Sequence, residues 1–294
     1  MAKKAVILGS AGQLGQELAI EFAAFDYDVR AWDRAAVDIS SAPGVEQALA
    51  SFDPDVVINA AAYNQVDVAE KEPVAAFQIN ALAVRNIAVA CRQTGARLVH
   101  FSTDYVFDGR TSRPYRETDP THPLGAYAVS KLAGELYAQA YLDNALIIRT
   151  SGVFGPGGLN TARGNFVELM LRLAASGHPI RVVEDHVASP TYAPALASRT
   201  RELVELGATG VVHCGGGEAI SWYDYAKLIF EASGLKPELR PTDEREYRTP
   251  ARRPRYSALD NSHLESLGAT PMPPLSECIR TYLTLRNQKL VELR

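Results

Sequence analysis

Cysteine is scarce in this sequence. Only three cysteines occur among 294 residues, and Cys91, Cys214 and Cys278 are scattered without C-x-x-C spacing. This number and spacing predict neither a disulfide framework nor a zinc site. We therefore expect a protein of a reducing compartment, the cytoplasm, that binds no metal.

Basic charge and long apolar runs are missing as well. The formal net charge is −4 at pH 7, so the chain lacks the basic excess that is typical of proteins that bind nucleic acid or anionic membranes. The apolar segment at residues 5–8 is too short for a signal peptide, and no apolar run approaches the length of a membrane span. We therefore expect no nucleic-acid partner and no membrane partner.

Short apolar segments alternate with helical stretches over the first half of the chain. Segments such as 56–59 (VVIN) are apolar throughout, which suits strands that are buried on both faces of a sheet. Strands that are spaced by helices indicate a parallel sheet, so the pattern predicts an α/β fold with a doubly wound parallel sheet of the Rossmann type. The expected strands are 5–8, 29–32, 56–59, 98–102 and 145–151, and the expected helices are 16–25, 43–51, 73–94 and 125–141.

The regular alternation weakens after residue 150. We expect residues 1–150 to form a dinucleotide-binding Rossmann domain and residues 151–294 to form mainly a smaller α/β substrate-binding cap. A strand at 210–214 is expected in this cap, and segments near 180–206 are expected to return to the Rossmann domain.

Three glycines follow the first expected strand and open the first expected helix. Gly9, Gly12 and Gly15 have the spacing G-x-x-G-x-x-G, which is found in extended short-chain dehydrogenases. In this position the first glycine permits a tight turn, the second lets backbone N–H groups approach a pyrophosphate, and the third lets helix and strand pack closely. The motif predicts a dinucleotide cofactor.

The second expected strand ends in an acidic and a basic residue. Asp33 is placed where a carboxylate can accept hydrogen bonds from the adenosine ribose. The guanidinium of Arg34 could neutralise the additional phosphate of NADP. The pair predicts that the protein accepts both NAD and NADP.

A tyrosine and a lysine four residues apart carry the strongest catalytic signal. Tyr127 and Lys131 fall on one face of an expected helix. An ammonium group beside a phenol lowers the pKa of the phenol, which makes it a better proton donor near neutral pH. Ser102 and Thr103 end an expected strand, and their hydroxyls could bind a reacting carbonyl oxygen. These residues predict a carbonyl reductase.

Several sequence blocks resemble the dTDP-4-dehydrorhamnose reductase family of extended short-chain, NAD(P)-dependent oxidoreductases. The resemblance covers nearly the full length, and the blocks occur in the order of the family. The blocks are GSAGQLGQEL, NAAAYNQVDVAEKEP at 59–73, STDYVFDG at 102–109, AYAVSKLAGE at 126–135, SPTYAPALA at 189–197 and RRPRYSALD at 252–260.

The resemblance implies an NADPH- or NADH-dependent reduction of a C4 keto group on a dTDP-linked deoxysugar, a step of carbohydrate biosynthesis, by a monomer or homodimer. It assigns catalysis to Thr103, Tyr127 and Lys131 and sugar contacts to Asp104 and Tyr105. Arg253 is implied as a partner of the substrate diphosphate. The implied cofactor contacts are Gly12, Gln13 and Leu14 at the pyrophosphate, Asp33, Asp38 and Ile39 at the adenosine, and Ala62, Tyr63 and Asn64 near the nicotinamide.

The chain departs from the family pattern at one position. The family block R-T-S-W-V-Y reads here R-T-S-G-V-F, so that Gly152 replaces a tryptophan that flanks the sugar in the family. Without that side chain we expect a wider pocket, which bears on the identity of the sugar. We expect the glycine-rich loop 155–165 to close over the gap. Trp222, Tyr223 and Tyr225 are interpreted as packing residues and the buried His100 as a core residue.

Two other functions compete with the reductase. A nucleotide-sugar epimerase needs the same catalytic residues and a retained cofactor, and a non-catalytic NADP-binding subunit could regulate a partner enzyme. Related dehydratases carry an Asp-Glu pair directly after the threonine, whereas this chain has Asp104 and Tyr105. The missing glutamate disfavours dehydration, and the intact Thr103, Tyr127 and Lys131 disfavour the regulatory subunit.

Overall fold

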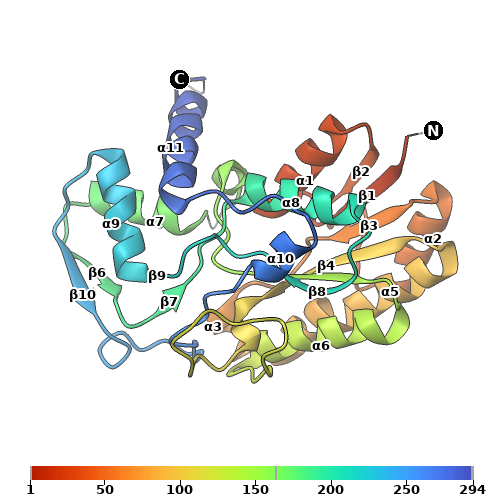
Figure 1. Cartoon of the computed structure of the whole chain (residues 1–294), viewed down its shortest axis with the longest axis horizontal. Helices are drawn as coiled ribbons and strands as arrows, with labels where there is room; N and C mark the ends of the chain where they lie inside the picture. Colours follow the sequence, from red (N-terminus) through yellow and green to blue (C-terminus); the bar gives the residue numbers. More distant parts are fainter. Residues whose placement is uncertain (1, 163, 293–294) are drawn as a thin grey trace.

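A parallel sheet of six strands forms the centre of the computed structural model, which describes residues 2–162 and 164–292 (Figure 1). The strand order is β2-β1-β3-β4-β5-β8, so the expected doubly wound parallel sheet is confirmed. Every residue of β3 and β5 is buried, because helices cover both faces of the sheet. The strands are β1 (Lys4–Leu8), β2 (Asp28–Trp32), β3 (Val56–Asn59), β4 (Arg97–Thr103), β5 (Leu146–Thr150) and β8 (Gly210–His213).

Each face of the sheet packs against its own group of helices. On one face the core includes Leu18, Phe22 and Leu196, and on the other it includes Leu49 and Ile87. The helices of the first face are α1 (Gln13–Ala24), α8 (Ala193–Glu205) and α10 (Ser262–Ser266); those of the second are α2 (Ala42–Phe52), α5 (Ala83–Thr94) and α6 (Ala126–Tyr141).

The expected helix 73–94 is present, but it is not a uniform α-helix. It consists of α4 (Pro73–Phe77), a π-helical turn η1 (Gln78–Leu82) and α5. By length and composition Pro73–Thr94 could cross a membrane, contrary to the expectation that no such segment exists. Half of its apolar window is buried inside the protein, as in the core helix of a globular fold. This finding is weak evidence for a membrane span.

The strand near residue 210 lies in the main sheet, so its assignment to the cap was wrong. Strand β8 pairs in parallel with β5, with Val212 opposite Ile148. A parallel neighbour needs a long crossover connection, and α8 supplies it by packing against α1 through Leu196 and Leu203. About sixty residues separate β5 from β8, so the local alternation of strands and helices does not reveal the pairing.

A smaller group of elements lies beside the sheet, beyond the carboxyl ends of its strands (Figure 1). Its core joins aromatic side chains such as Phe154, Tyr225 and Tyr282. The division of the chain at residue 150 stays a prediction. The elements are α7 (Phe166–Ala175), α9 (Trp222–Ser233) and α11 (Leu275–Glu292), with the strand pairs β6 (Ile180–Val183) with β10 (Leu239–Thr242) and β7 (Val187–Ala188) with β9 (Ile220–Ser221).

Candidate active site

The glycine motif lies where the winding of the sheet reverses. Strands β2 and β3 flank β1 on opposite sides, and ligands of doubly wound folds bind at the carboxyl ends of strands at such a point. Gly9 has φ +77°, and a Cβ there would lie 2.6 Å from backbone atoms of Ala61. A Cβ at Gly15 would collide with the Gly9 carbonyl oxygen. The loop thus requires glycine at both positions.

The same loop prepares the N-terminus of α1 for an anion. Gly12 is the N-cap residue and has no capping side-chain hydrogen bond within the described structure. The first N–H groups of a helix carry partial positive charge and have no partner inside the helix. The backbone at Gln13 and Leu14 is therefore suited to a pyrophosphate, while the Leu14 side chain packs against the core.

The glycine-rich segment after β5 packs on this helix start. The Gln13 side chain donates from Nε2 to the Val153 carbonyl oxygen at 2.8 Å and accepts at Oε1 from Asn165 Nδ2 at 2.9 Å. A Cβ at Gly157 would lie 2.5 Å from the Gln13 carbonyl oxygen. The loop 155–165, whose residue 163 lies outside the described residues, thus meets α1 rather than Gly152.

The residues expected at the adenosine end surround the turn after β2. Asp33 accepts at Oδ1 from the N–H groups of residues 35 and 36, at 3.0 and 2.9 Å, and the neighbouring Arg34 is exposed. Asp38 is exposed, and hydrogen bonds from Ser40 lower the pKa of its carboxyl. Ile39 is buried in the core, so its side chain supports the turn from the core side.

A buried asparagine holds the segment that is expected near the nicotinamide. Asn80, in the π-helical turn, accepts at Oδ1 from the Tyr63 N–H at 2.8 Å and donates from Nδ2 to the Tyr63 carbonyl oxygen at 3.0 Å. It also donates to Ser130 Oγ at 3.0 Å, and Ser130 lies on α6. Asn80 therefore ties the backbone beside Ala62 and Asn64 to the helix that carries Tyr127. The sequence analysis did not identify it.

The expected catalytic residues meet at the carboxyl end of β4. Thr103 ends this strand, and α6, which carries Tyr127 and Lys131, packs directly against it. Lys131 Nζ donates to the Phe101 carbonyl oxygen at 2.5 Å, and burial lowers the pKa of this ammonium to about 8. The Tyr127 ring meets Tyr105 edge to face, with centroids 6.2 Å apart. The structure thus brings the helix of Tyr127 and Lys131 next to the strand that ends in Thr103.

Asp104 lies inside a cluster of hydroxyl groups. Its carboxylate accepts from Thr103 Oγ1 at 3.1 Å, from Ser151 Oγ at 2.8 Å and from Ser257 Oγ at 2.5 Å. The residue is only 3% exposed, and burial raises the pKa of its carboxyl to about 6. Asp104 therefore joins β4, the end of β5 and the segment after the RRPR motif. Its expected sugar contact stays a prediction.

Arg253 forms an ion pair in this structure. Its Nη1 and Nη2 atoms bind the two carboxylate oxygens of Asp67 at 3.0 and 2.8 Å, and its guanidinium lies near the Tyr105 phenol. Burial and Asp104 raise the pKa of the Tyr105 phenol. The expected contact of Arg253 with a diphosphate remains untested, but the residue lies beside the tyrosine that was expected at the sugar.

A buried ion pair behind the catalytic residues escaped the sequence analysis. Arg149 of β5 donates to Glu135 of α6 from Nε at 2.9 Å and from Nη2 at 2.7 Å, and Ser102 Oγ donates to the same carboxylate. Both charged side chains are at most 6% exposed. Glu135 is four residues after Lys131, so the spacing on α6 was the available signal. His213 lies beside Arg149, and burial lowers the pKa of its imidazole to about 3.

His100 is a core residue, as interpreted from the sequence. It is fully buried, and its Nδ1 atom lies 3.2 Å from Asn59 Nδ2. Its Nε2 atom has no hydrogen-bond partner among the described residues. Burial holds the pKa of the imidazole well below its usual value. A neutral histidine in this position serves packing rather than proton transfer.

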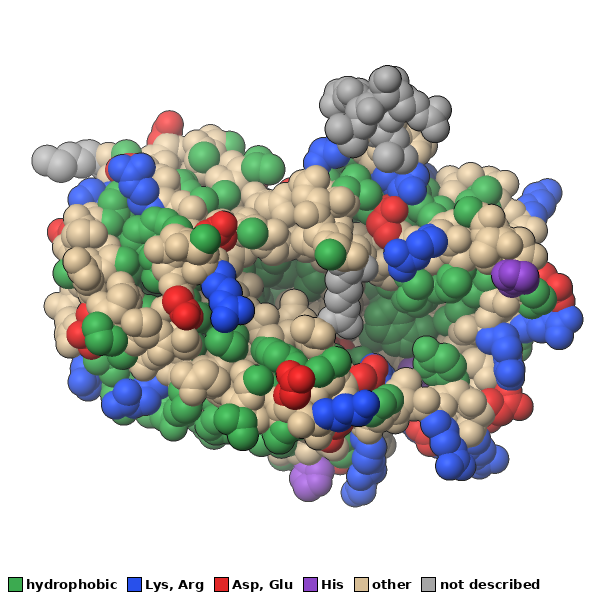
Figure 2. Space-filling view, turned by 180° about the vertical axis from the view of Figure 1, so that it is seen from behind, with side chains coloured by type: hydrophobic (Ala, Val, Ile, Leu, Met, Phe, Trp, Pro, Cys, Tyr) green, Lys and Arg blue, Asp and Glu red, His purple; other side chains and the backbone are tan. Residues whose placement is uncertain are grey.

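Gly152 faces a tryptophan from the smaller group of elements. Its φ is +49°, and a Cβ there would lie 3.3 Å from Cη2 of Trp222 and 3.4 Å from Cα of Pro190. The gap expected at residue 152 is therefore bordered by an indole ring. Figure 2 shows the molecule from behind the view of Figure 1. This face is hollowed near its middle, and hydrophobic side chains gather in the hollow.

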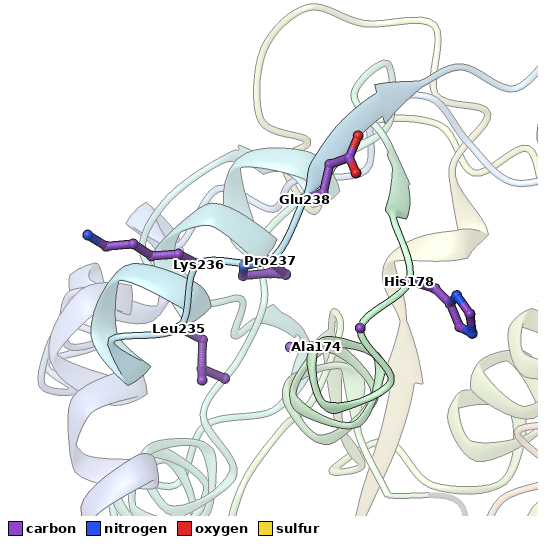
Figure 3. Close-up of a pocket in the computed structure, with 7 residues that line it drawn as sticks. Ala174, His178, Leu235, Lys236, Pro237 and Glu238 are labelled. Carbon is purple, nitrogen blue, oxygen red and sulfur yellow. The ribbon is translucent and has the colours of Figure 1, made fainter.

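Two other features are poor candidates for the site. A pocket of about 330 Å³ between Ala174 and Leu235 lies far from the glycine motif, and in Figure 3 the side chains of Lys236 and His178 point away from each other. A cluster of possible metal ligands has atoms within 4.8 Å of one another, but Arg255 pairs with its glutamate. The cluster consists of Asp185, His186 and Glu244.

Comparisons with known proteins identify the family that this chain resembles. A family model described as the RmlD substrate binding domain matches residues 3–287. The dTDP-4-dehydrorhamnose reductase of Mycobacterium tuberculosis is 38% identical over 96% of this chain and 93% of its own length. The spore coat polysaccharide biosynthesis protein SpsK of Bacillus subtilis is 37% identical over 97% of this chain and 98% of its own length.

A solved structure extends the similarity to a cofactor complex. It is the dTDP-4-dehydrorhamnose reductase of Bacillus anthracis in complex with NADP, which is 34% identical and superposes with a TM-score of 0.92. The match covers 97% of this chain and 99% of that chain.

Proposed function

This chain belongs to the dTDP-4-dehydrorhamnose reductase family, and we propose that it reduces the C4 keto group of dTDP-4-dehydrorhamnose to give dTDP-L-rhamnose. The substrate is a dTDP-4-keto-6-deoxy-L-mannose, and the enzyme is an NAD(P)-dependent oxidoreductase. One observation carries the proposal: Thr103, Tyr127 and Lys131 lie at the carboxyl edge of the sheet that also carries the dinucleotide-binding glycines.

The residues present fit a dinucleotide. Side chains at Gly9 and Gly15 would fill or distort the loop before α1, and the uncapped helix start offers N–H groups to a pyrophosphate. Gln13 and Leu14 would hold the pyrophosphate, Asp33 and Arg34 the adenosine ribose end, and Lys131 the ribose near the nicotinamide. When bound, the reduced nicotinamide supplies a hydride for C4 of the sugar.

The protein's own residues handle the carbonyl oxygen. Thr103 would donate to this oxygen through Oγ1, which now donates to Asp104. Tyr127 would give its phenolic proton to the oxygen as the C4 hydroxyl forms, and the Lys131 ammonium would stabilise the resulting phenolate. Because the pKa of Lys131 is lowered to about 8, this stabilisation weakens above that pH. The described lysine thus predicts a loss of activity on the alkaline side.

The decisive experiment follows the absorbance of NADPH and NADH with dTDP-4-keto-6-deoxy-L-mannose as substrate. We expect the wild type to oxidise the cofactor and Tyr127→Phe to lose about a hundredfold to ten-thousandfold in kcat, the usual contribution of a general acid. Tyr137→Phe on the same helix is the matched control, because Tyr137 packs beside Tyr141, away from the site.

The other outcomes identify the competing functions. Wild-type protein that retains NAD and inverts a sugar centre without added reductant would be an epimerase. Folded protein that binds NADPH and oxidises none with any 4-keto sugar nucleotide would be a regulatory subunit. If Tyr127→Phe turned over at the wild-type rate, Tyr127 would not be the proton donor.

We further propose a cytoplasmic enzyme that acts as a monomer or homodimer without nucleic-acid or membrane partners. One relative, from Bacillus subtilis, is named as a spore coat polysaccharide biosynthesis protein. Cys91, Cys214 and Cys278 are free and buried, which suits a reducing compartment. Gel filtration with light scattering would measure the oligomeric state.

A further inference from the structure

We propose that Trp222 forms an aromatic wall of the sugar subsite and determines how well the sugar part of the substrate is bound. The inference rests on the proposed function, because it assigns a substrate contact to that same site. It changes the interpretation of Trp222 from a packing residue to a specificity-determining residue. The observation behind it is that a Cβ at Gly152 would lie only 3.3 Å from Cη2 of this indole.

The place of Gly152 in the sheet brings Trp222 to the reacting atoms. Thr150 at the end of β5 pairs with Thr103 at the end of β4, and Gly152 follows two residues later. Adjacent strands are about 5 Å apart and a residue advances about 3.3 Å, so Gly152 lies within a sugar's reach of Thr103. Ser151, between them, donates to Asp104. The indole therefore borders the same edge as the catalytic hydroxyl.

Trp222 is packed among aromatic side chains but is not fully buried. Phe166 meets the ring edge to face with centroids 4.7 Å apart, and the fully buried Tyr225 lies 6.0 Å away. The indole is only partly buried, and Gly152 opposite it is exposed. The surrounding aromatic side chains thus fix the ring, while part of it remains accessible.

Glycine at position 152 is favoured by this arrangement for two reasons. Its φ of +49° lies in the left-handed region that side chains disfavour, and a Cβ would press on the indole at 3.3 Å. The apolar surface at this point is therefore supplied by the smaller group of elements rather than by β5. An aromatic ring in this place offers a flat surface to the apolar face of a deoxysugar.

The first test separates binding of the sugar from binding of the cofactor. Trp222→Leu is expected to raise the KM for dTDP-4-keto-6-deoxy-L-mannose about tenfold, the effect of losing one aromatic contact, with an unchanged KM for NADPH. Trp222→Phe should recover part of the loss. The control is Tyr223→Leu, the adjacent aromatic side chain, whose ring lies beside Lys227. An unchanged sugar-nucleotide KM in folded Trp222→Leu would overturn the proposal, and so would an equal rise in Tyr223→Leu.

The second test needs no turnover. The chain has two tryptophans, so Trp32→Phe leaves Trp222 as the only indole fluorophore. Titration with dTDP-L-rhamnose should change its emission, whereas titration with dTDP alone should change it less. Equal changes with both ligands would contradict a sugar contact. Wild type without keto-sugar turnover would refute the proposed reaction, whereas this titration would still decide the role of Trp222.

Discussion

The catalytic edge and the cap edge of the site are built in different ways. We use catalytic edge for Thr103, Tyr127 and Lys131, and cap edge for Ser257, Arg253 and Trp222. Behind the catalytic edge lies a buried polar network that joins two strands and a helix. The cap edge is held by contacts between separate segments, such as the hydrogen bond of Ser257 to Asp104 and the ion pair of Arg253 with Asp67. The half to which we assign the reaction is thus backed by a buried network, whereas the half to which we assign the sugar depends on separable contacts.

The largest effect on stability is expected at the network behind the catalytic edge. Glu135→Ala leaves the Arg149 guanidinium buried without its carboxylate partner. Breaking one side of a buried pair costs about 3–5 kcal/mol in the free energy of unfolding. Urea denaturation measures the loss. The control Glu184→Ala removes an exposed carboxylate and should change stability little. Equal losses of stability in both variants would show that the buried pair stabilises the fold no more than an exposed carboxylate does.

A pH-dependent effect is expected where the two edges meet, at Asp104. The pKa of this buried carboxyl is raised from 3.8 to about 6. Between these values the folded protein holds a proton that the unfolded chain has lost, so the stabilisation is present below about pH 4 and is lost as the pH rises through about 6. The total is up to about 3 kcal/mol, and about 1 kcal/mol of it falls between about pH 5 and 7.5.

Asp104→Asn should abolish this pH dependence. Both proteins are unfolded with urea at the two pH values given above. The free energy of unfolding of the variant should increase relative to that of the wild type as the pH rises. Parallel curves for the two proteins would show that Asp104 ionises without cost in the folded state.

A smaller effect is expected where the loop after β5 meets the cofactor-binding helix. The added methyl of Gly157→Ala would lie 2.5 Å from the Gln13 carbonyl oxygen. Overpacking of this kind costs about 1–3 kcal/mol, and displacement of the helix start should raise the KM for NADPH. Gly177→Ala is unsuitable as a control because its φ is +71°. Ser176→Ala, at an exposed position, serves instead. If Gly157→Ala lost stability but kept an unchanged KM for NADPH, the loop would not contribute to cofactor binding.

The smallest effect on stability is expected at the cap edge. Asp67→Asn weakens the ion pair with Arg253, and because the two side chains are 39% and 23% exposed, solvent limits the loss to at most about 1 kcal/mol. The sugar-nucleotide KM should rise nonetheless, since Arg253 also lies near Tyr105, a residue expected at the sugar. If Asp67→Asn lost as much stability as Glu135→Ala, the two edges would not differ in how strongly their contacts stabilise the fold.

The features that the sequence could predict are those that repeat locally or follow a short spacing. The apolar segments predicted the first five strands of the sheet, and the spacing of Gly9, Gly12 and Gly15 predicted the turn before α1. The roles of the individual site residues stay predictions, although the structure brings Thr103 next to the helix of Tyr127 and Lys131.

The missed features depend on contacts between distant segments. Arg149 and Glu135 pair across a helix and a strand, and β8 joins the sheet after a long interruption. Trp222 meets Gly152 across seventy residues. No local pattern contains such contacts, because they arise only when the tertiary packing brings the segments together.

The return of the chain to β8 also has a consequence for how such a protein can change. Residues between β5 and α8 form an excursion whose two ends are attached to neighbouring strands of the sheet. The ends stay fixed by the pairing of Ile148 with Val212, whatever the length of the excursion. Insertions and deletions between β5 and α8 can therefore be accommodated without a change in the pairing of β5 with β8, so the length of this segment can vary while the sheet stays the same.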